Sequence, residues 1–355
     1  MKLFKKIICF FTLLFPMFVF FEVASADDLT FSVDPVPSEH QVDKTKTYFD
    51  LKIKPNMKEI ITINVYNHSD QDIVVEPSIH TATTNLNGVV EYGESLTKPN
   101  STIPYHMEQI VKPLTKEVTI PKNGQNELQF EIEMPAKEFK GILAGGISIK
   151  EKKINENSKS DSKGMAVENE YLYISAIILH GDNKNIPEKL ELTNVKVDQV
   201  NHRNVINLSL KNSASRYINQ LSIEAHVLKK GSKKSIFTSK KEMMQMAPDS
   251  NFNYPIELNG DKLKPGDYVV KVEAKSKDKI WNFDKELIVT KEKAKKLNSQ
   301  DVSIKKNNRL IYYLIGIICL VTATIVLFSY NKRLNSKKIE ISKLKKQLEE
   351  KDLNK

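Results

Sequence analysis

The chain has almost no cysteine. Of its 355 residues only Cys9 and Cys319 are cysteines, and both lie in uncharged apolar runs near the two ends. The long segment between these runs can therefore form no disulfide, and its folded state must depend on a hydrophobic core.

The sequence also lacks the motifs that commonly mark an active site. Its seven histidines are widely spaced and form no H-E-x-x-H pair, and there is no G-x-S-x-G turn. Gly145 and Gly146 lie in an apolar run that we expect to be a strand, where glycine permits a bulge or close backbone approach. We therefore expect no catalysis, no cofactor and no metal site.

Both ends of the chain carry membrane signals. Residues 1–26 combine early lysines, an apolar run and a final Ala-Ser-Ala, which predicts a signal peptide cleaved after Ala26. Residues 310–330 carry no charge, and at about 1.5 Å per residue they can cross a hydrocarbon core of roughly 30 Å. The signal peptide then predicts that residues 27–309 lie outside the cell membrane and that the basic tail 331–355 lies in the cytoplasm.

The net charge of +10 does not indicate a nucleic-acid partner. Residues 27–290 carry 35 basic and 37 acidic side chains, so the excess lies in the signal peptide, in the stretch 291–309 and in the tail. We interpret 291–309 as a basic juxtamembrane stretch that attracts anionic lipid or wall polymer. An exported region without cysteine fits a protein of the Gram-positive envelope.

The pattern between the anchors predicts an all-β fold. Apolar residues alternate with polar ones in runs such as 59–66 and 127–134, and Asn87-Gly88 separates two short runs as in a tight hairpin. We expect two tandem immunoglobulin-like β-sandwich domains and one C-terminal transmembrane helix, with the single tryptophan, Trp281, packed in the second sandwich.

The boundary between the two domains has two readings. We expect the apolar runs 141–149 and 171–179 to pair as a hairpin around a polar loop at 151–166, which gives domains at 27–183 and 187–290. A boundary near 155 would instead assign the second run to the second domain.

The best candidate for a binding site is the hairpin tip. Its hydroxyl, amide and aromatic groups suit the hydrogen bonding and ring stacking that sugars require. The predicted peptidoglycan-binding residues are Thr83, Thr84, Asn85, Asn87 and Tyr92. The simpler alternative is a soluble turn of ordinary composition.

Several motifs together resemble a known family. In the first half they are Phe31-Ser32-Val33, Asn67-His68-Ser69-Asp70, Ala82 to Gly88 and Gly145-Gly146; in the second half they are Tyr171-Leu172-Tyr173, Met246 to Ser250, Lys264 to Tyr268 and Trp281-Asn282-Phe283. These resemble the peptidoglycan domain and the host-binding domain of the WxL-interacting proteins. Two departures are Asn56, where the family usually has glycine, and Asp249, where asparagine is commoner.

The resemblance implies a function on the surface of low-GC Gram-positive bacteria. It implies that the first domain binds peptidoglycan, that the second meets host surface or matrix components, and that the whole chain partners WxL-domain proteins. We therefore expect a non-enzymatic adhesion scaffold. An envelope chaperone for surface proteins is the alternative, and a wall hydrolase is a third reading.

Overall fold

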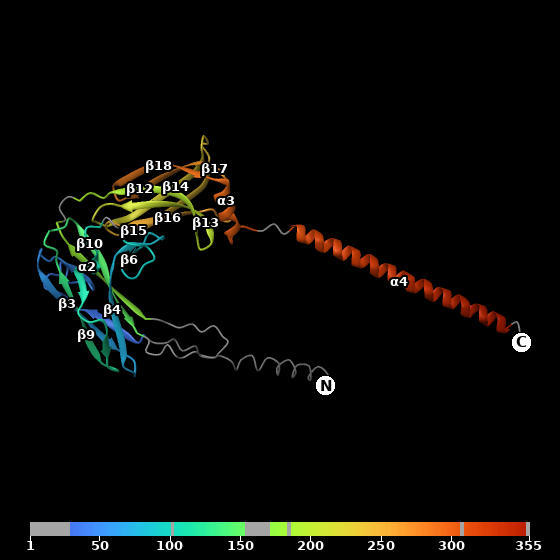
Figure 1. Cartoon of the computed structure of the whole chain (residues 1–355), viewed down its shortest axis with the longest axis horizontal. Coiled ribbons are helices and arrows are strands. Elements are labelled where there is room, and N and C mark those ends of the chain that lie inside the picture. The colour runs from blue at the N-terminus through green and yellow to red at the C-terminus, as the bar shows by residue number, and fades with distance from the viewer. Residues whose placement is uncertain (1–28, 101–102, 153–170, 183–185, 306–308, 353–355) are drawn as a thin grey trace, which may run out of the picture.

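The computed structural model describes residues 29–100, 103–152, 171–182, 186–305 and 309–352. Two β-rich domains meet at an angle, and a long helix extends away from the second domain toward the C-terminus (Figure 1). The chain is thus all-β in two domains with one apolar C-terminal helix, as its sequence predicted. The predicted signal peptide and nearly all of the predicted loop 151–166 lie outside the described residues.

The first domain contains two sheets that share a hydrophobic core. One is antiparallel in the order β1-β3-β9-β7, with bounds Phe31–Pro35, Lys58–Asn67, Gln125–Glu133 and Val111–Pro113. The predicted alternation is present, because Ile61, Ile63 and Val65 are buried while Ile60 is exposed. Burying one face of each strand contributes most of the stability of such a sheet.

The second sheet has the order β2-β11-β10-β4-β8, with bounds Phe49–Leu51, Leu172–His180, Ile142–Glu151, Ile73–Thr81 and Val118–Ile120. The predicted pairing of the two apolar runs is confirmed, because β10 and β11 are antiparallel from Ile142 opposite His180 to Lys150 opposite Leu172. β2 pairs with β11 in parallel, and the short helix α2 (Met107–Ile110) buries Met107 and Ile110 in the same core.

The paired glycines of β10 allow the neighbouring strand β4 and the segment at Tyr92 to approach β10 closely. A Cβ atom on Gly146 would lie 2.2 Å from the carbonyl oxygen of Tyr92, and one on Gly145 would lie 2.5 Å from that of His80. Neither position can hold a side chain without a shift of the neighbouring backbone. The predicted role of this glycine pair is confirmed.

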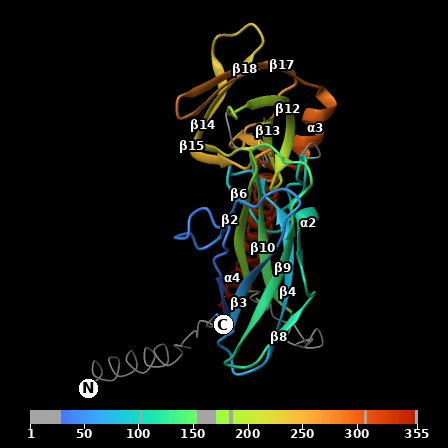
Figure 2. The ribbon, with the colours of Figure 1, turned by 90° about the vertical axis from the view of Figure 1, so that its left-hand side faces the viewer.

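A small hairpin projects from the first domain toward the second. It consists of β5 (Thr83–Thr84) and β6 (Val90–Glu91), which pair antiparallel around the predicted Asn87-Gly88 turn. Figure 2 shows it between the long strands of the first domain and the strands of the second domain that lie across their end. We call residues 83–91 the junction hairpin.

The second domain also packs two sheets around one core. Their orders are β12-β13-β16 and β15-β14-β17-β18. The bounds are Leu190–Val200, Arg203–Asn212 and Asn251–Glu257 for the first sheet, and Ser235–Met246, Ile218–Lys229, Gly266–Ser276 and Lys279–Val289 for the second. Trp281 and Phe283 pack against this core, as predicted.

The stretch 291–309 differs from its sequence-based interpretation. Its first part is the helix α3 (Lys291–Gln300). Thr290 caps this helix, because its hydroxyl accepts a hydrogen bond from the Lys293 N–H. Ala294 and Leu297 are buried in the second core. Part of the expected juxtamembrane stretch is therefore a packed element of the second domain.

The C-terminal helix α4 (Arg309–Asp352) is continuous. Within it, Tyr313–Lys343 is long and apolar enough to cross a membrane, and its most apolar part is not buried by any other element. The predicted span 310–330 and most of the predicted tail 331–355 fall on this one helix.

Candidate binding site at the domain junction

Thr84 joins the two domains through its side chain. The residue is fully buried, and its hydroxyl lies 2.7 Å from the Ser250 hydroxyl and accepts a hydrogen bond of 3.0 Å from the Ala247 N–H. The Ser250 hydroxyl also donates to the Ala247 carbonyl at 2.8 Å. Because these groups are buried, breaking one of these hydrogen bonds would leave a donor or acceptor without a partner and would destabilise the fold.

The rest of the hairpin is held by its own polar groups. Thr83 is buried, with 2% of its surface exposed. The Asn85 side-chain oxygen accepts from the N–H groups of Asn87 and Val89, and its amide donates to Glu91 at 2.9 Å. These bonds close the turn in the way asparagine commonly does.

The tip of the hairpin contacts β15 of the second domain. The Gln245 N–H donates to the Gly88 carbonyl at 2.7 Å, and the Lys241 ammonium donates to the Asn87 side chain at 3.3 Å. Gly88 has a φ of 68°, and a Cβ atom there would lie 2.6 Å from the Met244 side chain. Only glycine fits both the backbone and the space.

Tyr92 completes the contact between the domains. Its hydroxyl lies 3.1 Å from that of Tyr217, and both rings pack on a small buried cluster that contains Ala144 of the first domain and Ala247 of the second. Burial raises the pKa of Tyr92. Burial also raises the pKa of Tyr217 well above its ordinary value, and the neighbouring Tyr92 phenol raises it further. Both phenols are therefore neutral at physiological pH.

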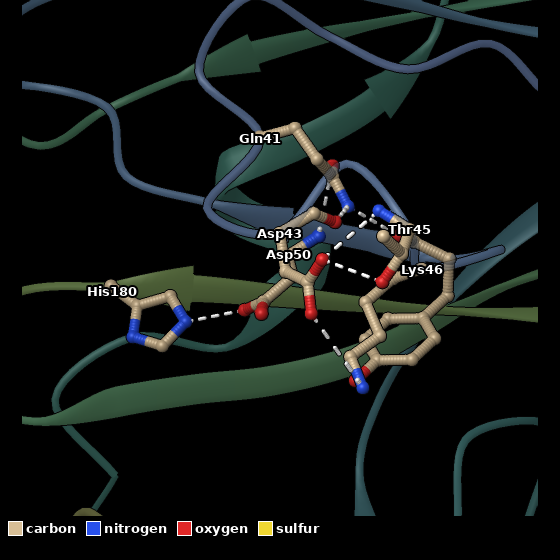
Figure 3. A network of polar contacts seen from close by, with 7 residues as sticks. Gln41, Asp43, Thr45, Lys46, Asp50 and His180 are labelled. Atoms are coloured by element: carbon tan, nitrogen blue, oxygen red, sulfur yellow. Dashed lines mark hydrogen bonds and ion pairs between the residues drawn. The ribbon is translucent and has the colours of Figure 1, made fainter.

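A polar network lies around β2 in the first domain (Figure 3), and its Asp50 is near enough to Tyr217 to help raise the pKa of that phenol. His180 on β11 contacts the carboxylate of Asp50 on β2, and the Gln41 amide donates to the Tyr48 carbonyl at 2.8 Å. The Gln41 side-chain oxygen accepts from the Asp50 N–H at 3.2 Å. These contacts tie the loop before β2 to the sheet edge.

A hollow of about 280 Å3 opens between the hairpin tip and the second domain. Leu86 and Asn87 line it on one side. The other side comes from β15, β16 and the turn after β16, with Thr238, Ser239, Lys240, Lys241, Tyr254, Pro255, Glu257 and Asn259. We call this hollow the tip groove; its hydroxyl, amide and ammonium groups suit a polar ligand rich in oxygen atoms.

The structure thus brings all five predicted site residues to one place. Thr83 and Thr84 are buried against the second domain, Asn85 shapes the turn, Tyr92 contacts Tyr217, and Asn87 is exposed and lines the tip groove. Sequence reasoning missed Tyr217 and Lys241 at this site. It named Ser250 only as part of the Met246-to-Ser250 motif of the family resemblance, with no role in binding.

No group of three or more His, Cys, Asp or Glu side chains in the described ranges is placed to hold a metal ion. What the site offers is a set of hydrogen-bonding groups fixed by contacts between two β domains.

These features define a class: a two-domain β protein with a polar groove at its junction and a helix long and apolar enough to cross a membrane. Comparison with known protein families shows which family within this class the chain belongs to. Residues 31–151 match the peptidoglycan binding domain of the WxL Interacting Protein, and residues 162–299 match its host binding domain. The chain belongs to the WxL-interacting protein family, and it is a cell-surface protein with a peptidoglycan-binding domain.

The family matches and the sheets divide the chain at different points. β11 falls inside the host-binding match, yet it pairs with β10 and β2 of the first domain.

Other comparisons add only distant likenesses. No curated protein matches the chain. Among solved structures, the class 5 fimbriae chaperone CfaA has 12% identity and a TM-score of 0.30, over 73% of this chain and 100% of that one. The CsuC–CsuE complex of Acinetobacter baumannii has 12% identity and a TM-score of 0.32, over 73% and 98%. The Escherichia coli chaperone DraB has 14% identity and a TM-score of 0.26, over 73% and 98%.

Proposed function

We propose that this protein is a membrane-anchored scaffold of the cell surface. It binds peptidoglycan through its first domain, and it binds WxL-domain proteins and host surface components through its second. The observation that carries this proposal is the order of the parts: a peptidoglycan-binding match, a host-binding match and then an apolar helix that can cross a membrane.

The sequence supports the orientation that we propose. A cleaved signal peptide exports the N-terminal side, so both β domains lie outside the membrane and the basic end of α4 lies in the cytoplasm. Peptidoglycan is then within reach of the first domain.

The protein acts by holding other molecules, and we propose no catalytic step. Both family domains are named for binding, and the groups gathered at the junction form hydrogen bonds that fix a shape. Of the five predicted glycan-contact residues, we propose direct contact for Asn87, which is exposed beside a groove. Thr83, Thr84, Asn85 and Tyr92 then hold the hairpin in place.

The test is co-sedimentation of the full-length protein, in lipid nanodiscs, with purified insoluble peptidoglycan at low and at physiological salt. We expect retention at both salts, with empty nanodiscs left in solution. A WxL-domain protein added in the same buffer should be captured. Loss of retention at physiological salt would mean that the protein contacts the wall only by non-specific charge attraction, because salt screens such attraction. Absence of both retention and capture would refute the scaffold.

A further inference from the structure

The tip groove continues into a second hollow. That hollow has about 190 Å3 and shares Pro255, Glu257 and Asn259 with the tip groove. It extends around β16 to the turn between β12 and β13, and it reaches Ser303 beyond α3. Together the two hollows form one elongated groove, from the junction hairpin to the end of the second domain that leads to α4.

The far end of this groove is fixed by α3 and the residues after it. The Asp301 carboxylate accepts a hydrogen bond from the Asn204 N–H at 2.8 Å, and the Val302 N–H donates to the His202 carbonyl at 3.0 Å. The adjacent turn residues Asn201 and Asn259 are exposed and line the groove. The hydrogen bonds of Asp301 and Val302 therefore fix the backbone beside these amide side chains.

The charges in the groove are mostly cationic, and two of the cations lack an acidic partner. Lys240 pairs with Glu242 at 2.7 Å, whereas in the described part of the chain neither Lys241 nor Arg203 forms an ion pair. Lys241 instead donates to the neutral side chain of Asn87. Lys241 lines one end of the groove and Arg203 the other.

This combination selects a class of ligand. Amide side chains can pair with acetamido groups, and hydroxyl and carboxylate groups can bond sugar hydroxyls. A lysine and an arginine that form no ion pair within the described residues suit carboxylates, with arginine able to bind one in a bidentate manner. An elongated groove suits a polymer rather than a single sugar.

We propose that this groove binds an N-acetylated glycan that carries carboxylates, as the peptide-bearing strands of peptidoglycan do. The inference rests on the proposed peptidoglycan binding and extends the site from the junction hairpin of the first domain along the adjoining groove of the second. The first domain contributes the junction hairpin, while Lys241 and Arg203 of the second domain bind the carboxylates.

The test uses full-length protein in nanodiscs and two soluble probes, a muropeptide and a neutral oligomer of N-acetylglucosamine, measured by calorimetry. Lys241→Ala and Arg203→Ala should each weaken muropeptide binding about tenfold, as expected for a charge-assisted hydrogen bond. The neutral oligomer should bind more weakly and change little. Lys233→Ala, at the exposed turn between β14 and β15, is the matched control and should bind as the parent does.

The possible outcomes separate the two proposals. If the parent protein sediments with peptidoglycan but neither Lys241→Ala nor Arg203→Ala weakens muropeptide binding, the groove is not the site and the proposed function stands. If the parent binds neither insoluble peptidoglycan nor the muropeptide, the proposed function itself fails. Because Arg203 is exposed and Lys241 half-buried at the surface, we expect both variants to keep the parent's unfolding temperature.

Discussion

Asn56 and Asp249, the two residues that depart from the usual family pattern, share an unusual backbone. Their φ angles are 60° and 48°, in the left-handed region. Glycine and asparagine adopt this conformation with the least strain. The glycine that the resemblance leads us to expect at position 56 and the asparagine at position 249 would both adopt this backbone with little strain.

Asp249 also provides a prediction at the scale of one residue. Burial raises the pKa of its carboxyl group, and its Oδ2 atom has no hydrogen-bond partner among the described residues. A group whose pKa is raised on folding stabilises the fold fully at low pH, and this stability is lost as the pH rises through the folded-state pKa. Asp249→Asn should therefore raise the unfolding temperature at pH 7, with a gain that disappears toward pH 4.

Thermal unfolding between pH 4 and pH 7 checks this expectation. Asp261→Asn is the control, because Asp261 is exposed, and it should change little. An equal gain for Asp249→Asn at every pH would assign the effect to the left-handed backbone instead of the charge.

Among the structural elements, the junction hairpin depends on one glycine. Gly88→Ala would place a Cβ atom 2.6 Å from Met244 at a φ of 68°, so it combines backbone strain with overlap. We expect a loss of about 2–4 kcal/mol in the free energy of unfolding. Gly231→Ala is a matched control, because its φ is 84° but no atom lies within 4 Å of the added Cβ.

The control should lose only about 1 kcal/mol, the cost of the backbone alone. Urea denaturation of the two variants and the parent measures the difference. Equal losses would show that the hairpin is not clamped against Met244.

Elements with a clear pattern were predicted, whereas the short helix α2 and the helix α3, which lack such a pattern, were missed. The strands alternate with period two, and Asn87-Gly88 is a strong hairpin signal, so both could be predicted. α3 has only two buried apolar residues, Ala294 and Leu297, among basic ones. Its composition resembles a solvated juxtamembrane stretch, and only the packing of those two side chains distinguishes it.

At the scale of the whole molecule, the arrangement of the domains could not be predicted from the sequence. Thr84 and Ser250 are 166 positions apart, and nothing in either local pattern shows that their hydroxyls meet. The hydroxyl-rich hairpin was correctly singled out as unusual. Part of its composition, however, serves the contact between domains.

Thr84→Val tests that contact. Valine has nearly the same shape but no hydroxyl, so the Ala247 N–H loses its acceptor, at a cost of about 1–3 kcal/mol. We expect a broader distance distribution between spin labels at residues 78 and 232, measured by electron–electron resonance in a Cys319→Ser background. Thr62→Val, on the outer face of β3, is the control. An unchanged distribution for Thr84→Val would mean that other contacts fix the angle.

The contact between Val302 and His202 also limits how far the protein can reach. Only seven peptide units separate Val302 from Arg309, where α4 begins, and a fully extended chain of that length spans about 25 Å at most. With α4 in a bilayer, this short connection keeps the second domain close to the lipid surface. If the groove binds glycan as proposed, its far end at Ser303 places the bound strand in the layer of wall nearest the membrane.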